Sequence, residues 1–229
     1  MSKKKLLKGI PRQFEIGLAL FGLVVAAPVL IVCAILIILN SRGPIFFRQK
    51  RIGLKGKEFT LFKLRTMAVA KTGRMITSAD DFRITSVGRI LRKTKIDELP
   101  ELWNVLRGDM SFVGPRPEVS EFVDLDDPLW QEILEHKPGI TDPVTLRLRN
   151  EEQLLATVID KELYYREVLQ PYKTRGYAKF VRDKSWKTDL RIIGRTLKAV
   201  LLPASVGTPS KEELQWSFIT SGQFENARK

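Results

Sequence analysis

The clearest pattern along the chain is a long apolar run close to the N-terminus. Residues 16–39, IGLALFGLVVAAPVLIVCAILIIL, contain no charged side chain. One straight α-helix over this run would be about 36 Å long, whereas the hydrocarbon core of a bilayer is about 30 Å thick. A cleaved signal peptide is not expected, because the run is long and no small-residue cleavage site is evident before Asn40. The pattern predicts a membrane-embedded segment within residues 1–40.

Two features favour a re-entrant segment over a single transmembrane span. Pro28 stands near the centre of the run, where it removes the hydrogen bond to the Val24 carbonyl and should kink or break the helix. Both flanks are basic, and a span can place only one of them on the cytoplasmic side that Lys and Arg prefer. The flanking cations are Lys3, Lys4, Lys5, Lys8 and Arg12 before the run, and Arg42, Arg48, Lys50, Arg51, Lys55 and Lys57 after it. We predict a helix–break–helix that enters and leaves on one face, with a single span as the alternative.

The remainder, residues 41–229, predicts a mostly helical α+β domain. Apolar runs on either side of Lys55-Gly56-Lys57 predict a small β-hairpin. We expect a short helix capped by Ser86, and a second helix from Asp97 to Gly108. Residues 118–135 hold seven acids and no Lys or Arg, which indicates a solvated helix or loop. The apolar face of the second helix would comprise Leu99, Leu102, Trp103 and Leu106.

A second amphipathic pattern lies near the C-terminus, over about residues 185–202. Its apolar positions recur at helical spacing, which predicts one helix with an apolar stripe. We expect this stripe either to pack on the domain core or to lie in the membrane interface. Trp186 and the cations beside the stripe favour the interface. The stripe comprises Trp186, Leu190, Ile193, Leu197, Val200 and Leu201.

Composition narrows the chemistry. The single cysteine, Cys33, excludes an internal disulfide, and the single histidine, His136, argues against a His/Cys zinc site and against Ser-His-Asp catalysis. The formal net charge of +13 favours an anionic partner, either nucleic acid, an acidic membrane or a phosphorylated substrate. Residues 42–75 hold ten Lys or Arg and one acid. Candidate phosphate contacts from this region are Arg51, Lys63 and Arg65.

An acidic pair interrupts the basic pattern in KTKIDELPELWNVLRGDMSFVGPRPE, residues 93–118. Asp97 and Glu98 open the expected helix, where an acid ordinarily caps the backbone and opposes the dipole. Because cations surround the pair, two chemical roles stand beside capping: coordinating Mg²⁺ together with phosphate oxygens, or attacking phosphorus. Gly114 and two prolines fix Arg116, whose guanidinium suits phosphate. The surrounding cations are Arg92, Lys93, Lys95, Arg107 and Arg116.

Several motifs together resemble the bacterial sugar transferase family, the small monotopic phosphoglycosyl transferases. They are SRGPIFFRQKRIG, FKLRTM, RITSVGRILRKTKIDELPELWNVLRGDMSFVGPRPE and KPGIT. The resemblance covers residues 10–142 and, more weakly, the C-terminal amphipathic helix. It implies a monotopic enzyme on the cytoplasmic face of the bacterial inner membrane. Such an enzyme moves a sugar 1-phosphate from a UDP-sugar to undecaprenyl phosphate, releases UMP, and so begins the assembly of a glycan.

The resemblance also implies roles for individual residues. Asp97 corresponds to the family's nucleophile, which also contacts Mg²⁺, and Glu98 to its acidic partner. Arg92 and Arg116 match arginines expected near phosphate, and Arg149 matches the end of a motif expected to help bind the donor. The chain departs from the family in PGITDPVTLRLRN, where Asp142 replaces a glycine. This departure leaves the donor sugar open.

Two hypotheses from other classes compete with the enzyme. A membrane-anchored basic module would bind nucleic acid or acidic lipid, with Asp97 only a cap. Asp97, Glu98 and Glu101 stand where a recognition helix would need cations, so we expect no nucleic acid partner. A catalytically inactive adaptor is the other hypothesis, and the intact acidic pair argues against it. The sequence leaves open the sugar, the polyprenol length and the oligomeric state, with a homodimer as one option.

Overall fold

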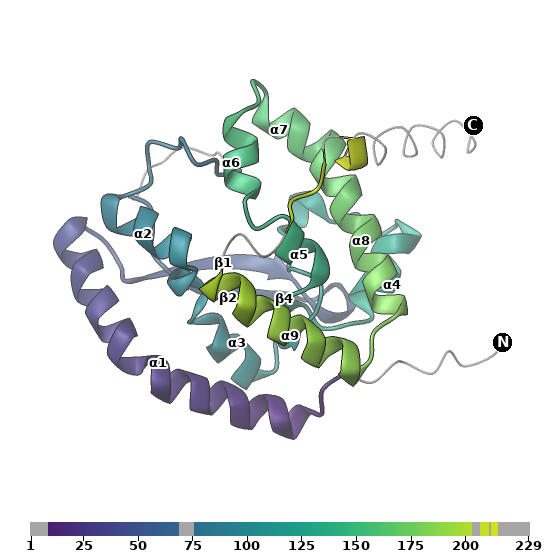
Figure 1. The fold of residues 1–229 in the computed structure, drawn as a ribbon, viewed down its shortest axis with the longest axis horizontal. Coiled ribbons are helices and arrows are strands. Elements are labelled where there is room, and N and C mark those ends of the chain that lie inside the picture. The colour runs from purple at the N-terminus through teal and green to yellow at the C-terminus, as the bar shows by residue number, and fades with distance from the viewer. Residues whose placement is uncertain (1–8, 69–75, 203–206, 211, 215–229) are drawn as a thin grey trace.

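The fold is that of a computed structural model, which describes residues 9–68, 76–202, 207–210 and 212–214. It is mostly helical, with two small sheets, as the sequence predicts (Figure 1). The basic residues Lys3, Lys4, Lys5 and Lys8, on which part of the topology prediction depends, lie outside the described residues.

The apolar run forms a single helix, α1, from Arg12 to Asn40. Pro28 lies inside this helix, so the predicted interruption is absent and the segment is not two separate helices. Figure 1 shows that α1 follows a bent path instead, as expected where proline removes one backbone hydrogen bond. Only 17% of its most apolar 18-residue window is buried, and it is long and apolar enough to cross a membrane.

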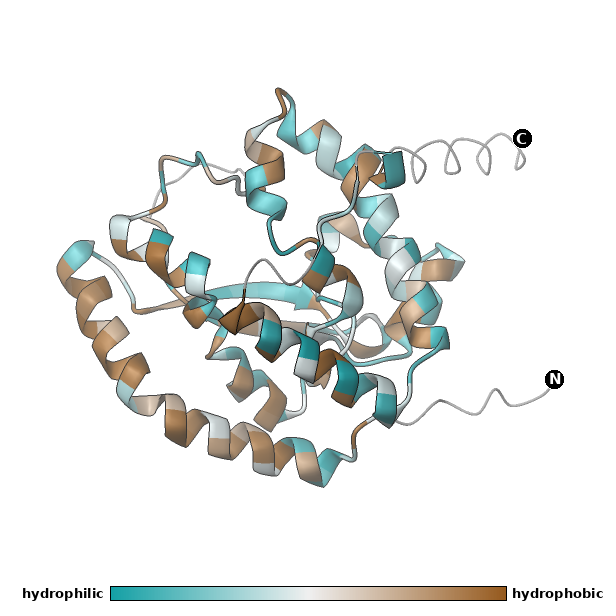
Figure 2. Cartoon of the chain, viewed as in Figure 1, coloured by the Kyte–Doolittle hydropathy of each residue, from teal (hydrophilic) through white to brown (hydrophobic). Residues whose placement is uncertain are grey.

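Both ends of α1 are attached to the same domain. At the N-terminal end, the Arg12 guanidinium donates to the Val105 carbonyl at 2.6 Å. At the C-terminal end, the Arg65 guanidinium donates to the Ser41 carbonyl at 2.8 Å. Buried α1 side chains join two apolar clusters, Ala19 with Leu61, Val105 and Met110, and Cys33 and Ile37 with Leu64 and Leu91. Most of the other large apolar side chains of α1 are exposed, and Figure 2 shows the hydrophobic colouring of this helix along most of its length.

The predicted hairpin is present. Strands β1 (Phe46–Ile52) and β2 (Glu58–Leu64) pair antiparallel, with Phe46 opposite Leu64. The turn (η1, Leu54–Gly56) needs positive φ at Lys55 and Gly56, of 57° and 73°. A second, parallel pair joins β3 (Ser111–Val113) to β4 (Gly139–Thr141).

Short helices surround these strands (Figure 1). The main core cluster forms mostly between α4, η4 and α8, around Trp130, Tyr165, Leu169 and Tyr177. The N-cap of α2 is Thr85 and not Ser86, because the Thr85 hydroxyl accepts the Gly88 N–H at 2.9 Å. The helices are α2 (Ser86–Thr94), η2 (Ile96–Glu98), α3 (Glu101–Arg107), η3 (Ser120–Phe122), α4 (Pro128–Leu134), α5 (Pro143–Arg147), α6 (Glu151–Ala156), α7 (Lys161–Tyr164), η4 (Tyr165–Leu169), α8 (Gln170–Arg182) and α9 (Trp186–Leu201).

The buried face of α3 differs from the predicted one, whereas α9 exposes most of its apolar stripe, the alternative that the sequence favours. In α3, Trp103 is 50% exposed while Glu101 and Asn104 are buried, because Asn104 hydrogen-bonds the β2 backbone. In α9, which spans the predicted range, most of the apolar stripe is exposed and the buried residues are Asp189, Ile192 and Ala199. Most of the stripe therefore does not pack on the core of the described domain, and it can contact another apolar environment.

Candidate active site

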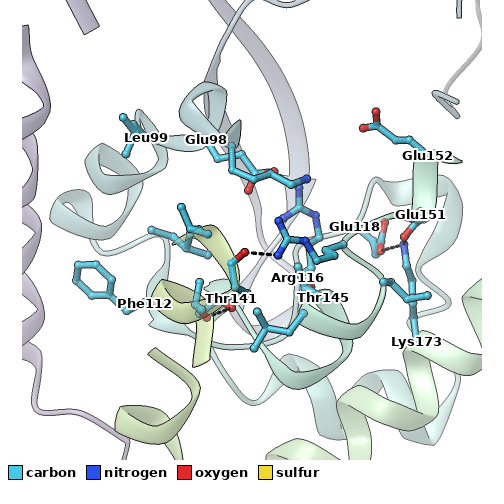
Figure 3. Close-up of a pocket in the computed structure, with 18 of the residues that line it drawn as sticks. Glu98, Leu99, Phe112, Arg116, Glu118, Thr141, Thr145, Glu151, Glu152 and Lys173 are labelled. Carbon is cyan, nitrogen blue, oxygen red and sulfur yellow. Dashed lines mark hydrogen bonds and ion pairs between the residues drawn. The ribbon is translucent and has the colours of Figure 1, made fainter. Parts of the chain in front are cut away.

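A cavity of about 550 Å³ opens between the α1–α3 side of the domain and α9. Its lining combines two kinds of side chain, several of which Figure 3 shows gathered around it. Charged residues come from η2, the loop after β3, and helices α6 and α8, whereas α1, α3 and α9 contribute apolar ones. The charged residues include Glu98, Arg116, Glu118, Glu151 and Lys173, and the apolar ones Leu18, Leu102, Ile193, Leu197 and Val200.

Asp97 does not cap a helix. It lies in the 3₁₀ turn η2, whereas α3 begins at Glu101 with Pro100 at its N-cap and no side-chain cap. Asp97 is 6% exposed, and its Oδ1 is buried without a hydrogen-bond partner in the described part of the chain. Burial, followed by the neighbouring charge of Glu98, raises the pKa of Asp97, and Lys63, Lys95 and Arg92 offset only part of this. A buried carboxylate without a partner is costly, so it calls for an explanation beyond folding.

Glu98 links the two predicted motifs directly. Its Oε1 accepts from Lys63 Nζ at 2.7 Å and from the Arg116 guanidinium at 2.6 Å. Burial would raise the pKa of Glu98, but Arg116, Lys63 and Lys95 outweigh it and hold that pKa well below its usual value. The Glu98 charge in turn raises the pKa of Arg116 well above its usual value. Glu98 and Arg116 both line the cavity, while Asp97, one residue away, is not among its lining residues.

The other predicted cations differ in their placement. Arg51 and Arg149 line the cavity. Arg51 Nη1 lies 3.7 Å from Glu118 and donates to the Pro117 carbonyl at 3.0 Å. Arg149 donates to the Ala199 carbonyl of α9. Lys63 stands behind the wall, bound to Glu98 and 3.2 Å from Glu101 Oε1.

Two predicted phosphate contacts are engaged elsewhere. The Arg92 guanidinium binds both carboxylate oxygens of Glu152, at 3.1 and 2.5 Å, and lies outside the cavity wall, although its charge still lowers the pKa of Asp97. Arg65 is buried and donates to the carbonyls of Ile37, Ser41 and Arg42. Arg65 therefore caps the C-terminal end of α1 and lies outside the cavity wall, and its assignment as a phosphate contact stays a prediction.

Sequence reasoning missed a charged network on the wall of the cavity. Glu118, expected on a solvated segment, is 6% exposed. Lys173 Nζ lies 3.5 Å from Glu118, 2.9 Å from Glu151 and 3.0 Å from the Tyr165 hydroxyl. Burial would lower the pKa of Lys173, but the two carboxylates outweigh it and raise that pKa well above its usual value. No local pattern in the sequence pairs Lys173 with the two carboxylates, because Glu151 and Glu118 are 22 and 55 positions away.

The acidic pair fits a divalent cation of the Mg²⁺ type. Among the described residues, no group of three or more His, Cys, Asp or Glu side chains could hold a metal ion. Mg²⁺ does not require such a group, since one or two carboxylates together with substrate phosphates and water usually suffice. The unpartnered Oδ1 of Asp97 could serve as one such ligand, and Glu98 is its neighbour.

Asp142, where the chain departs from the family pattern, has a structural role. It is fully buried, and its Oδ1 accepts the N–H groups of Val144 and Thr145 at 2.7 and 3.0 Å. Asp142 is thus the N-cap of α5. Since Thr145 and Leu146 of α5 line the cavity, the cap fixes part of its wall.

Comparison with known proteins places this site in context. A Bacillus subtilis protein with the provisional name undecaprenyl-phosphate N-acetylgalactosaminyl 1-phosphate transferase is 46% identical over 117 residues. UDP-glucose:undecaprenyl-phosphate glucose-1-phosphate transferases of Caulobacter vibrioides and Escherichia coli are 45% and 42% identical over 126 and 137 residues. The matches cover 50%, 53% and 58% of this chain, and 65%, 47% and 30% of the relatives. This chain therefore spans less than two thirds of the length of each of these relatives.

The family comparison extends further along the chain than these pairwise matches. The model of the bacterial sugar transferases matches residues 6–203, which include α1, the Asp97–Glu98 turn, the cavity and α9. The chain belongs to the bacterial sugar transferase family.

Proposed function

We propose that this protein transfers a sugar 1-phosphate from a UDP-sugar to undecaprenyl phosphate and releases UMP. One observation carries the proposal: Asp97, whose buried Oδ1 has no hydrogen-bond partner among the described residues, lies beside the Glu98–Arg116 pair at a cavity that is charged in one part and apolar in another. The named activities of the relatives, which use UDP-glucose or an N-acetylgalactosaminyl group, support the substrate classes and leave the sugar open.

The reaction proceeds in two displacements at phosphorus. In the first, an Asp97 carboxylate oxygen attacks the phosphorus bonded to the sugar, and the bond to the bridging oxygen breaks. UMP leaves with that oxygen and both bonding electrons, and a phospho-sugar remains on Asp97 as an acyl phosphate. In the second, an oxygen of the lipid phosphate attacks the same phosphorus and releases the Asp97 carboxylate. The product is a polyprenyl-diphospho-sugar.

Residues of this chain prepare both steps. No hydrogen bond within the described part of the chain restrains Asp97 Oδ1, so rotation of the side chain can turn it from its buried position toward the cavity. The Glu98–Arg116 pair holds the guanidinium in place, where it can stabilise charge on the transferred phosphoryl group. Mg²⁺ bound by Asp97, with Glu98 beside it, would neutralise phosphate charge and make UMP a better leaving group.

We infer a monotopic topology on the cytoplasmic face of the bacterial inner membrane. Both ends of α1 are bonded to one domain, Arg12 to Val105 and Arg65 to Ser41, which supports a helix that enters and leaves on one face. The exposed apolar stripe of α9 supports a second contact with the interface. The lipid phosphate can then reach the cavity without leaving the membrane.

A turnover assay tests the function. Purified protein in detergent, with Mg²⁺ and undecaprenyl phosphate, is offered a panel of UDP-sugars while UMP and the lipid product are quantified. We expect one donor to give UMP and polyprenyl-diphospho-sugar in equal amounts. Lipid product accompanied by UDP, and not UMP, would show transfer of the sugar alone and would contradict the proposal.

A further inference from the structure

The cations that line the cavity differ in whether their charge is already compensated. Arg116 is paired with Glu98 at 2.6 Å, and Lys173 with Glu151 at 2.9 Å. Arg51 lies 3.7 Å from Glu118. A cation with a near carboxylate forms an almost neutral pair, so it adds little net attraction for an incoming phosphate. The lining cations are Arg51, Lys95, Arg116, Arg149 and Lys173.

Lys95 differs from these paired cations. Its ammonium has neither a hydrogen bond nor an ion pair with any residue that the structure describes. It is half-buried and lies two positions before Asp97. It lines the same cavity as Glu98 and Arg116. Lys95 thus brings to the cavity wall an ammonium that no described carboxylate holds in an ion pair.

The backbone at Lys95 is also unusual. The residue ends α2 in the left-handed conformation, with φ 60° and ψ 16°, where its N–H donates to the Arg92 carbonyl. A residue with a side chain is strained in this conformation, and glycine is the usual choice. A lysine at this position is therefore not explained by the helix end alone.

We propose that Lys95 binds a phosphate oxyanion of a substrate at the start of the reaction. The ligand is a phosphate carrying one or two negative charges, and two substrates of the proposed function provide one: the diphosphate of the nucleotide-sugar and the terminal phosphate of the lipid. A compact ammonium suits this task, because it acts as a point charge and tolerates the movement of phosphate between two displacements. The inference depends on the proposed function for the identity of these two substrates.

Three variants separate binding from folding. Lys95→Met removes the charge while keeping the length of the side chain, and Lys95→Arg restores a cation. Lys93→Met is the matched control, because Lys93 is an exposed cation at the end of the same helix and does not line the cavity. For each variant, KM is measured with donor varied and with acceptor varied, and the melting temperature is recorded.

We expect Lys95→Met to raise one of the two KM values at least tenfold with kcat changed less than threefold, and Lys95→Arg to restore it to within threefold. The affected KM identifies the phosphate: the donor diphosphate or the lipid phosphate. Lys93→Met should leave both values within twofold. Both KM values unchanged in Lys95→Met would overturn the inference, and so would a KM that rises equally in Lys95→Met and Lys95→Arg.

Failure of the proposed function would look different. The wild-type protein would then turn over no donor, and calorimetric binding of inorganic pyrophosphate would replace the kinetic comparison. If Lys95→Met binds pyrophosphate at least fivefold more weakly than both wild type and Lys93→Met, this result supports Lys95 as a phosphate ligand without the proposed function. Equal affinities would overturn it.

Discussion

At the scale of the residue, the buried carboxylate of Asp97 destabilises the folded state. Its carboxylate is buried, and Oδ1 has no hydrogen-bond partner among the described residues. An acid whose pKa is raised by folding binds protons more tightly in the folded state, so stability is highest below the unfolded pKa and falls as pH rises through the folded pKa. The unfolded reference for Asp97 is 3.8. Reactive groups are often held at such a cost.

We predict that Asp97→Asn abolishes transfer and stabilises the fold. The melting temperature in detergent should exceed that of wild type by a few degrees at pH 7, because about 1 kcal/mol corresponds to about 2–4 °C in a chain of this size. The difference should shrink as the pH is lowered and wild-type Asp97 takes up a proton, because its pKa is raised in the folded state. A variant less stable than wild type at pH 7 would show that the ionised carboxylate is well satisfied.

Asp142 provides a second prediction at this scale. Asp142→Ala removes the acceptor for Val144 and Thr145, and an N-cap of this kind contributes about 1 kcal/mol. Chemical denaturation should therefore show a loss of about that size, while Asp142→Asn, which keeps an acceptor oxygen, should lose only a few tenths. Equal losses in both variants would mean that the charge, and not the cap, matters.

At the scale of the element, α9 presents an apolar stripe outward. Leu190 and Leu201 are 49% and 79% exposed, whereas a helix packed through this stripe would bury them. We predict that a fluorescent NBD label on Leu190→Cys, in a Cys33→Ala background, shifts to the blue when the protein joins anionic vesicles. The same label on Arg195→Cys, off the stripe, should shift much less. Equal spectra from the two sites would place α9 away from the interface.

Some elements of the fold can be predicted from local sequence patterns alone. The apolar run, the hairpin and the range of α9 follow local periodicity, and the structure confirms them. The exposed face of α9 and the buried Glu101 and Asn104 of α3 depend on which neighbour each helix meets, and periodicity carries no such information. A bend in a helix that contains Pro28 is expected from proline chemistry, but the continuity of α1 depends on packing along both halves of the helix.

The same distinction applies to the candidate site. Residue types and motif order single out Asp97, Glu98 and Arg116, and the structure brings the last two into contact. The pairing of Arg92 with Glu152, 60 positions away, and the burial of Glu118 beside Lys173 are long-range. A lysine or arginine in a sequence indicates affinity for anions, but only the fold shows whether a carboxylate already satisfies it. Backbone carbonyls already satisfy the Arg65 guanidinium. Lys95 lines the cavity, and its ammonium has no partner among the described residues.

At the scale of the whole molecule, α1 begins and ends on one domain. A maleimide that does not cross membranes should therefore label Lys3→Cys and Lys50→Cys from the same side, each in a Cys33→Ala background. We predict labelling of both in inverted inner-membrane vesicles and of neither in right-side-out vesicles. Labelling of the two positions from opposite sides would establish a transmembrane span and contradict the monotopic topology.

The most direct test of the central claim is a single-turnover experiment without lipid acceptor. Enzyme in excess over its UDP-sugar, with Mg²⁺, should release UMP in one burst of at most one per enzyme. Intact-mass analysis should show the protein heavier by one phospho-sugar, and Asp97→Asn should show neither signal. Adding undecaprenyl phosphate should discharge the adduct to lipid product. An active enzyme that releases no UMP and forms no adduct until lipid is added would contradict the account and require direct transfer between the two substrates.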